Sequence, residues 1–496
     1  MEPAAFAYTT PLYPVAAIRA MEQAAGSSGL MARAGQAAAT LAMELLPDDG
    51  SAVLVVAGPG NNGGDALVAA RLLKQAWHRV SVVFAGERSR LPEDAAQACD
   101  AWLAAGGTLE AQIPAAQFDL VIDGLFGIGL SKPLTGMLAE LVQQINALAL
   151  PVLALDIPSG LCADSGRVLG CAVRASHTLT FLGLKPGLFT LDGPDHAGTV
   201  HLTDLGVDGA AVPATPGALI ELPPALPAPR LRNSHKGSFG SVGVLGGDTS
   251  MVGAALLAAR AALLTGAGRV YAGLLADPAP AVDFGQPELM LRSAEALCAA
   301  EHLSVLAAGP GLGQSERAHS ALRQALQYPA PLLLDADALI LLAQQPELHR
   351  LLSARTYASI VTPHPGEAAS LLHCTIADIQ ADRIAAALQI ARDRHAVTVL
   401  KGAGSIIALE DGRWCINGSG NPGMASAGMG DVLAGIITGL IAQGMDAASA
   451  TLLGVYLHGA AADARVAAGS GPLGLTASEV ALAARALLNH WLAEQA

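Results

Sequence analysis

Short apolar runs alternate with longer Ala- and Leu-rich segments of helical period in the first half of the chain. The runs read SAVLVVAG, RVSVVFAG, FDLVIDGLFG and PVLALDIPSG, and the segments between them predict helices from near Asp65, Pro92 and Leu134. This rhythm is typical of a parallel sheet covered by helices, so we predict a Rossmann-like three-layer αβα domain. The runs HTLTFLGL and TVHLTDLGV predict two further strands, and the pattern leaves their pairing direction open.

A proline-rich segment between Val207 and Arg232 interrupts this pattern. The stretch VDGAAVPATPGALIELPPALPAPRLR carries repeated prolines, which neither continue a helix nor donate to a neighbouring strand. We therefore place a domain boundary there and predict two domains, residues 1–213 and residues 224–496.

A second α/β series follows the boundary. Strands are predicted at GSVGVLGG, GRVYAGLL, VLAAGPGLG, PLLLDADAL, ASIVTPHPGE and VTVLKGAG. Helices are predicted from Ser250, over about Ile379 to Arg394, and from near Gly428, Ala447 and Ser478. The second domain is therefore expected to be α/β as well.

The composition supports two aliphatic cores. The 496 residues exceed what one core usually serves, and hydrophobic residues are 52% against 4% aromatic residues. The mean hydropathy of +0.44 raises the question of a membrane protein, yet the apolar stretches are short or interrupted, as Arg260 interrupts the segment 252–268. We expect no membrane partner.

Charge and cysteine usage narrow the setting further. A net charge of -14 with only 28 Lys+Arg and no basic run argues against nucleic acid as a partner. The six cysteines form no CxxC pair, and the first residues resemble neither a secretory nor a transit signal. We expect a cytoplasmic protein with reduced thiols, and the apolar composition favours a homo-oligomer.

The segment GPGNNGGD, residues 58–65, is the first candidate site. It follows a predicted strand and opens a predicted helix, where free N–H groups and the helix dipole attract an anion. It is not the GxGxxG dinucleotide fingerprint, because Asn61 and Asn62 occupy its interior and offer amide groups to a ligand or a cation.

Polar residues also end two later strands of the first domain. Asp123 follows one of them, and Asp156 and Ser159 follow the next. Singly, each aspartate is more often a helix cap or a turn former. In a parallel sheet such strand ends converge on one crevice, so we expect these residues to join GPGNNGGD in one site.

Together, GPGNNGGD, DGLFGIGLSKP and LDIPSG resemble the NAD(P)H-hydrate epimerase domain over roughly residues 10–210. The resemblance implies that the hydrate is held by Asn61, Asn62, Gly63, Gly64, Asp65, Gly127, Ile128, Gly129, Leu130, Ser131, Lys132, Pro133 and Asp156. It also implies a K⁺ ion bound by Asn62, Asp123 and Ser159. Inverting the hydroxyl-bearing C6 of the ring needs a carboxylate that moves a proton, and we assign that role to Asp156.

Four glycine-rich loops mark the second domain. They are GPGLG at 309–313, TPHPGE at 362–367, KGAGS at 401–405 and NPGMASAGMGD at 421–431. The last runs directly into a predicted helix, which makes a phosphate cradle with Asp431 just inside it. His364 alone is more often an inconsequential loop histidine and Lys401 a solvated charge, but the four loops together predict a phosphoryl-transfer site.

The chain lacks the Walker A motif GxxxxGK[ST], which excludes a P-loop nucleotidase. The four loops instead resemble the ribokinase-like superfamily and, within it, the NAD(P)H-hydrate dehydratases, over roughly residues 230–490. The hydrate is then contacted by Ala254, Gly313, His364 and Asp431. The nucleotide is held by Lys401, Gly402, Ala403, Gly404, Ser405, Asn421, Gly423, Gly428 and Gly430.

The two resemblances together imply a bifunctional repair enzyme. It would interconvert the R and S hydrates of NADH and NADPH and dehydrate the S hydrate with ADP and Mg²⁺, giving AMP and phosphate. Asp431 would deprotonate the C6 hydroxyl as that hydroxyl attacks a phosphoryl group. No residue visibly excludes ATP or selects NADH over NADPH.

Two alternatives remain open at this point. Small-molecule kinases share the ribokinase-like fold and its anion-binding loops, and fold alone does not settle function. A scaffold that binds dinucleotides without turnover is the second alternative. The fused first domain and TPHPGE argue against the kinase, and the presence of Asp156 and Asp431 argues against the scaffold.

Overall fold

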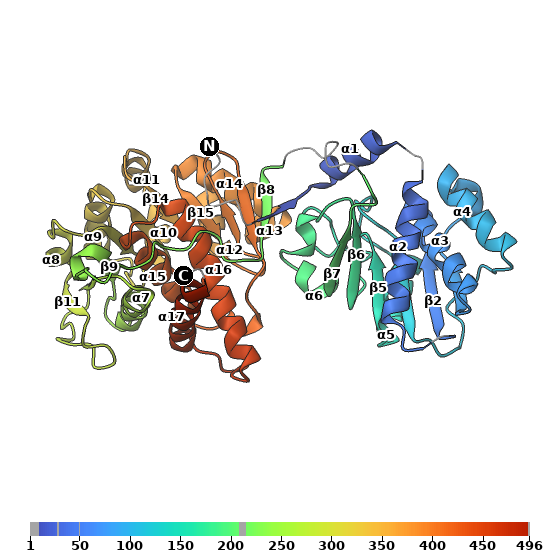
Figure 1. The fold of residues 1–496 in the computed structure, drawn as a ribbon. Helices are drawn as coiled ribbons and strands as arrows, with labels where there is room; N and C mark the ends of the chain where they lie inside the picture. The colour runs from blue at the N-terminus through green and yellow to red at the C-terminus, as the bar shows by residue number, and fades with distance from the viewer. Residues whose placement is uncertain (1–8, 27–28, 49, 208–214, 495–496) are drawn as a thin grey trace. The chain divides into compact units, whose positions relative to one another are not determined.

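The computed structural model describes residues 9–26, 29–48, 50–207 and 215–494. The chain forms two compact units that divide between Thr215 and Pro216, and Thr9 and Thr10 belong to the second unit (Figure 1). Residues 208–214, part of the proline-rich segment, lie outside the described residues. No helix among the described residues is both long and apolar enough to cross a membrane.

The unit of residues 11–215 is built on a parallel sheet with the strand order β3-β2-β4-β5-β6-β7. Its strands are β2 (Ala52–Ala57), β3 (Arg79–Phe84), β4 (Leu120–Gly124), β5 (Val152–Leu155), β6 (His177–Phe181) and β7 (Thr199–Thr203). The strands β6 and β7, whose direction the sequence left open, therefore pair in parallel.

Helices cover both faces of this sheet. Successive strand residues point to opposite faces, so Val53 and Val55 pack in one core and Leu54 and Val56 in another. The first core contains α1 (Val15–Ala25), α2 (Leu30–Leu45), α3 (Asn61–Gln75) and α4 (Glu93–Ala104), and the second contains α5 (Gly136–Ala147). The short helix α6 (Gly193–Ala197) lies between β6 and β7 in the chain. The predicted three-layer αβα architecture is confirmed.

The strand order reverses at β2. From β2 the chain proceeds outward to β3 and then returns to β4 on the other side. In open parallel sheets ligands bind outside the carboxyl ends of the strands at such a reversal. The loops after β2 and β4 therefore occupy the expected position of a site.

Most strands of a larger sheet, with the order β1-β8-β17-β16-β15-β14-β13-β12-β9-β10-β11, lie in the second unit. Its strands are β1 (Thr10–Leu12), β8 (Gly217–Ile220), β9 (Ser241–Gly246), β10 (Arg269–Leu274), β11 (Met290–Ser293), β12 (Val305–Ala308), β13 (Leu332–Leu334), β14 (Ser359–Val361), β15 (Val397–Leu400), β16 (Ile406–Ala408) and β17 (Trp414–Asn417). The strand β16 is antiparallel to both of its neighbours, while β9 to β15 pair in parallel. The order reverses at β9, so the loops after β9 and β12 flank a second switch point.

One face of this sheet is covered by α7 (Val252–Thr265), α15 (Met429–Ala442), α16 (Ala447–Ala467) and α17 (Ala477–Glu494), which share a core with the strands. The remaining helices are α8 (Ala294–Cys298), α9 (Glu316–Gln327), α10 (Asp337–Gln344), α11 (Pro346–Ser353), α12 (Pro365–Leu372), α13 (Ile376–Ala381) and α14 (Arg383–Arg394). Leu332, Leu333 and Leu334 are all fully buried, so both faces of β13 are covered. The predicted α/β class of the second domain is confirmed.

Two predicted elements differ from the structure. The helix expected over about 379–394 is two helices, because Asp382 ends α13 and caps α14 by accepting a hydrogen bond from Ala385 N at 2.9 Å. The helix expected from near Asp65 begins at Asn61, so GPGNNGGD provides its first turn as well as the loop. The three closing helices begin where the sequence predicted them.

The contact between α7 and α15 leaves no room for a side chain at Gly435. A Cβ atom there would lie 2.1 Å from the carbonyl oxygen of Ala258. We expect Gly435→Ala to lower the free energy of unfolding by about 1–3 kcal/mol, because the two helices must move apart. Denaturant unfolding followed by circular dichroism measures the loss.

The matched control is Gly253→Ala on the exposed side of α7, where a Cβ atom would meet nothing within 4 Å. It is expected to be neutral or to stabilise by up to about 1 kcal/mol, because alanine favours helix over glycine. Equal stability of Gly435→Ala and the wild type would contradict the packing argument.

Candidate active sites

The first site is formed where α3 begins against the ends of β2 and β4. At Gly58 a Cβ atom would lie 1.8 Å from the carbonyl oxygen of Leu125, and at Gly63 it would lie 2.0 Å from the carbonyl oxygen of Gly58. Only glycine permits these approaches. No described side chain caps the first N–H groups of α3, which starts at Asn61, so its positive end is available to an anion.

Asp123, in the fully buried strand β4, is held by three hydrogen bonds. Its Oδ1 accepts from Ser159 Oγ at 2.7 Å and from Leu125 N at 3.2 Å, and its Oδ2 accepts from Ser159 N at 2.8 Å. Burial raises the pKa of Asp123 to about 6, although these bonds favour the charged form and limit the rise. Asp123 and Ser159, predicted to act together, are thus in direct contact.

Asn62 lies beside this pair. A Cβ atom on Gly124 would lie 3.0 Å from the carbonyl oxygen of Asn62, which places α3 against the end of β4. Both side-chain amide atoms of Asn62 are buried and have no hydrogen-bond partner among the described residues. Because such groups are costly to leave unpaired, a polar ligand or a cation is the natural partner for this amide.

Asp156 occupies a strained turn at the end of β5. Its φ is 67°, in the left-handed region that non-glycine residues rarely adopt. Ile157 N donates to the carbonyl oxygen of Leu155 at 2.8 Å across it, which makes Asp156 the central residue of a γ-turn. The form with positive φ is rare and strained, and such strain clusters at functional sites.

The Asp156 carboxylate is held on both oxygens. Oδ2 accepts from Ile128 N at 2.8 Å, and Oδ1 pairs with Lys185 Nζ at 2.7 Å. Gly127 makes room for it, since a Cβ atom there would lie 2.4 Å from Oδ2. Lys185 was not predicted from the sequence, although a lysine directly after the apolar strand in HTLTFLGLK was a signal for it.

Asp65 completes the acidic side of the site. It is buried just beyond the first turn of α3, and burial together with the carboxylates of Asp156 and Glu22 raises its pKa well above the usual range. Glu22, on α1, has its pKa raised by burial and by Asp156. The sequence analysis also missed Glu22, which comes from a helix far from the motifs.

The structure thus brings together Asn62, Asp65, Asp123, Asp156 and Ser159. Gly127 and Ile128 lie directly against Asp156. The rest of that loop reaches toward solvent: Leu130 is partly exposed, and Gly129, Ser131, Lys132 and Pro133 are exposed. Their predicted part in binding stays a prediction.

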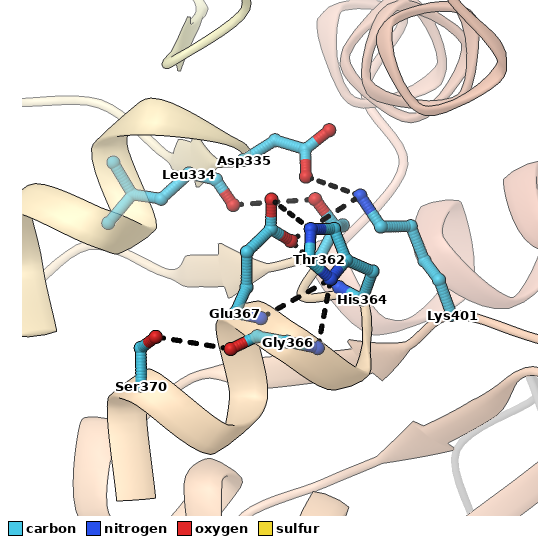
Figure 2. A network of polar contacts seen from close by, with 8 residues as sticks. All are labelled: Leu334, Asp335, Thr362, His364, Gly366, Glu367, Ser370 and Lys401. Atoms are coloured by element: carbon cyan, nitrogen blue, oxygen red, sulfur yellow. Dashed lines mark hydrogen bonds and ion pairs between the residues drawn. The ribbon is translucent and has the colours of Figure 1, made fainter. Parts of the chain in front are cut away.

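The second site lies at the ends of β13, β14 and β15 in the other unit (Figure 2). Asp335, directly after β13, is buried and pairs through Oδ1 with Lys401 Nζ at 2.6 Å. Glu367 Oε2 lies 3.9 Å from the same ammonium. Burial would lower the pKa of Lys401, but Asp335, Glu367 and Asp431 outweigh it and raise that pKa.

His364 caps helix α12. The ring Nδ1 of His364 accepts from Gly366 N at 3.0 Å and from Glu367 N at 3.3 Å. The backbone N–H of His364 donates to Glu367 Oε2 at 2.7 Å. Since Nδ1 accepts, the ring proton of the neutral form sits on Nε2, which lies 3.2 Å from Glu367 Oε1. Burial and the nearby Lys401 lower the pKa of His364 and favour this neutral form.

Helix α15 begins against the ion pair of Lys401 and Asp335. A Cβ atom on Gly430 would lie 3.2 Å from Lys401 Nζ and 3.3 Å from Asp335 Oδ2. Asp431, in the first turn of α15, has a pKa raised to about 6 by burial and by Asp335, against the lowering effect of Lys401. Gly428 starts the helix at φ 85°, where glycine is favoured.

The loop after β12 borders this centre. A Cβ atom on Gly309 would lie 1.8 Å from the carbonyl oxygen of Asp335. Gly313 N donates to Asp337 Oδ2 at 2.8 Å, and a Cβ atom on Gly311 would lie 3.3 Å from that of Ala254 on α7. Ala254, Gly313, His364 and Asp431, the predicted hydrate contacts, therefore come from elements that meet around Asp335.

The predicted nucleotide loops are internally bonded. Ser405 Oγ accepts from Gly402 N at 3.3 Å and donates to the carbonyl oxygen of Gly402 at 3.0 Å. Asn421 accepts from Gly423 N at 3.0 Å and donates to Asp463 Oδ1 at 2.8 Å. These bonds shape KGAGS, with Ala403 and Gly404 inside it, and NPG for a ligand, and they use the Asn421 side chain within the protein.

Three residues of the second site were missed from the sequence. Asp335 follows an apolar strand, as Asp123 and Asp156 do, so the same rule would have found it. Glu367 was visible in TPHPGE but was given no role. His458, buried on α16 with Nε2 unpartnered among the described residues, has its pKa lowered to about 4 by burial and by Lys401, and no motif marks it.

Comparisons with known proteins match both units. Residues 242–481 match the family model described as NAD(P)H-hydrate dehydratase, and residues 27–187 match the one described as YjeF-related protein N-terminus. The chain is 39% identical over 460 residues to the bifunctional NAD(P)H-hydrate repair enzyme Nnr of Escherichia coli (strain K12), covering 91% of this chain and 87% of that protein.

Two further proteins extend the comparison. The chain is 39% identical over 502 residues to the enzyme of the same name from Coxiella burnetii, covering 97% of this chain and all (100%) of that protein. A crystal structure of the ADP/ATP-dependent NAD(P)H-hydrate dehydratase from Bacillus subtilis is 30% identical, covers 54% of this chain and 94% of its own, and has a TM-score of 0.46.

The pKa of Glu367, raised to about 7 mainly by burial, makes stability depend on pH. An unfolded glutamate titrates near 4.5, so between about pH 4.5 and 7 the folded chain keeps a proton that the unfolded chain has lost. Stability therefore falls as the pH rises through this window, by up to about 3 kcal/mol from this group at 1.36 kcal/mol per pKa unit.

We expect Glu367→Gln to flatten this decline, as measured by denaturant unfolding at pH 5 and pH 7.5. The matched control is Glu301→Gln, at an exposed glutamate, which should retain the wild-type dependence. An unchanged decline in Glu367→Gln would show that the carboxyl does not hold its proton in the folded state.

Proposed function

Because the chain belongs to the family of bifunctional NAD(P)H-hydrate repair enzymes, with an epimerase domain and a dehydratase domain, we propose that Asp156 and Asp431 carry its two reactions. The observation that carries the proposal is the placement of both aspartates. Each lies near a lysine, the buried Lys185 or the half-buried Lys401, at a glycine-lined sheet edge close to the start of a helix.

In the epimerase unit, Asp156 acts as the acid and base for the C6 hydroxyl of the hydrate. Its carboxylate is fixed beside Gly127, and the substrate is held by residues 61–65 and 127–133. C6 bears both a ring nitrogen and a hydroxyl, so removal of the hydroxyl proton by Asp156 lets the C6–N bond break with its electron pair going to nitrogen, which takes up the proton as C6 becomes an aldehyde. Rotation about the C5–C6 bond and return of the nitrogen to the other face of C6, with the proton returned to the oxygen, gives the other epimer.

A potassium ion fits the donors of this site. Asn62 has an unpartnered buried amide oxygen, and Asp123 and Ser159 add hard oxygen atoms close by. These three residues would hold K⁺, and when bound it supplies positive charge beside the start of α3. Asp123 and Ser159 hold each other in place independently of the ion.

In the dehydratase unit, Asp431 takes the proton of the C6 hydroxyl as that oxygen attacks the β-phosphorus of ADP. A new O–P bond forms, the bond to the α-phosphate oxygen breaks, and AMP leaves. Phosphate then leaves C6 with the C–O electron pair, and loss of a proton from C5 restores the dihydropyridine. Hydroxide leaves poorly and phosphate leaves well, which is why a nucleotide is used.

The loops around Lys401 suit the nucleotide phosphates. Lys401 supplies a cation, and Gly430 places the N-terminal turn of α15, which begins after Gly428, against the same ammonium. The Lys401–Ser405 loop and Asn421 and Gly423 border them. Ala254, Gly313 and His364 border the hydrate.

Magnesium also fits this unit through the nucleotide. Among the described residues no cluster of three or more His, Cys, Asp or Glu side chains is placed to hold a metal ion. Mg²⁺ is commonly bound by one or two carboxylates together with substrate phosphates, and the Glu367 carboxylate would offer such oxygens. When bound it neutralises phosphate charge, while Lys401 and α15 position the phosphates.

The two aspartates are separated by assaying pure R and S hydrates with and without ADP. Asp156→Asn is expected to lower the interconversion of R and S by about 100-fold or more, because it removes the proton-transfer group, while dehydration of the S hydrate continues. Asp431→Asn is expected to lower dehydration of the S hydrate by about 100-fold or more, while the R and S hydrates still interconvert. Chromatography of the epimers and NADH absorbance measure the two reactions.

Loss of both activities in either variant would contradict the division of labour. Accumulation of a phosphorylated hydrate without NADH in the wild type would favour the small-molecule kinase. Binding of both hydrates with no turnover would favour the scaffold.

The raised pKa of Asp431 predicts the pH dependence of dehydration. A base must be deprotonated to act, so kcat/KM for the S hydrate should rise as the pH passes through about 6. Asp337, whose negative charge contributes to this raised pKa, provides a matched variant. We expect Asp337→Asn to move the rise to lower pH, and a rate independent of pH between 5 and 7 would exclude Asp431 as the base.

A further inference from the structure

Lys185 is a lysine with no exposure to solvent, just beyond the end of β6. An ammonium has three donors, and here each has an acceptor. Nζ lies 2.7 Å from Asp156 Oδ1, and it donates to Thr180 Oγ1 and to the carbonyl oxygen of Phe181, each at 2.8 Å. Fully buried lysines are rare unless they are paired, and Asp156 is the carboxylate that pairs with this one.

The three contacts orient the ammonium and the carboxylate together. Thr180 and Phe181 belong to β6, so the sheet itself fixes the position of Nζ. Asp156 is fixed from its other side by Ile128 N, and its backbone is constrained at φ 67°. The carboxylate therefore cannot turn about its axis without breaking a bond at one of its oxygens.

The surroundings of Asp156 are otherwise acidic. Asp65 on α3 and Glu22 on α1 both have their pKa values raised by burial and by the negative charge of Asp156. Arg19, also on α1, acts on Glu22. Lys185 is the cation in contact with Asp156, so its charge opposes the repulsion among three carboxylates.

From this geometry we propose that Lys185 is a positioning residue for epimerisation, which balances the negative charge of the Asp156 carboxylate and keeps it directed at the hydrate. The inference rests on the proposed role of Asp156. All three donors of Lys185 are bonded to acceptors within the protein, so its ammonium acts on the substrate through Asp156. Asp156 can then alternate between its charged and protonated forms while the lysine charge stays in place.

The test is the pH dependence of epimerisation of one purified hydrate epimer by the full-length chain. Lys185→Met is expected to lower kcat by at least about tenfold with little change in KM, and to move the acid limb of the profile to higher pH. The reason is that Asp156 would face Asp65 and Glu22 without a cation and would hold its proton more tightly. Dehydration of the S hydrate, in the other unit, reports the amount of folded chain.

Two further variants separate charge from packing. Lys185→Gln keeps the length and a donor but removes the charge, and it should shift the acid limb in the same direction. Thr180→Val removes another acceptor of Lys185 and leaves the ion pair with Asp156, so its acid limb should stay at the wild-type pH even where thermal stability falls.

A wild-type acid limb in both lysine variants overturns the inference. So does failure of both to fold, as judged by circular dichroism at the assay temperature, because the lysine would then be structural. Asp156→Asn in the same assay keeps the two claims apart. If Asp156→Asn still epimerises, the proposed role of Asp156 fails; if it is inactive while the lysine variants keep the wild-type profile, only the role of Lys185 fails.

Discussion

A carboxylate buried at the end of a parallel strand must be compensated, and both units meet this requirement with a lysine. Removing a carboxylate from water costs several kcal/mol, which an isolated site cannot offset. Asp156 pairs with Lys185 at 2.7 Å in one unit, and Asp335 pairs with Lys401 at 2.6 Å in the other. Around each pair lie other carboxyls that burial shifts upward, Asp65 in the first and Glu367 and Asp431 in the second. Each site therefore holds carboxyls of different proton affinity, which is what acid–base chemistry requires.

Glycine makes the approach to these charges possible. The turn after β2 and the turn after β12 both bring backbone atoms closer than any side chain would allow, at Gly58 and at Gly309. In both units the strand order reverses next to these turns. Each sheet provides the carboxyl ends of its strands, and the reversal of strand order leaves a crevice between the loops at those ends. The glycines allow a helix to begin directly beside that crevice. Loops from distant parts of the sequence thus face one small volume in each unit.

Much of the fold and of the two sites could be predicted because local sequence patterns determine it. Apolar runs gave the parallel strands, and Asp123 and Asp156 stood out because each ends such a run. The break at Asp382 was missed because Ile376–Arg394 has helical composition throughout, and the capping bond to Ala385 depends on backbone geometry. Lys185 and Glu22 were missed for a different reason. Their importance comes from contacts across the fold, and a lone lysine or glutamate carries no spacing that reveals its partner.

The left-handed turn at Asp156 restricts which residues can stand there. Of the side chains that bear a carboxylate, aspartate reaches this backbone region at low cost because its short side chain bonds locally, whereas glutamate does not. Asparagine and glycine tolerate the same backbone but supply no acid. The backbone thus excludes glutamate, and the chemistry excludes asparagine and glycine. Every single replacement at this position therefore loses the conformation, the charge or both, so the reaction is expected to be lost even where the turn is retained.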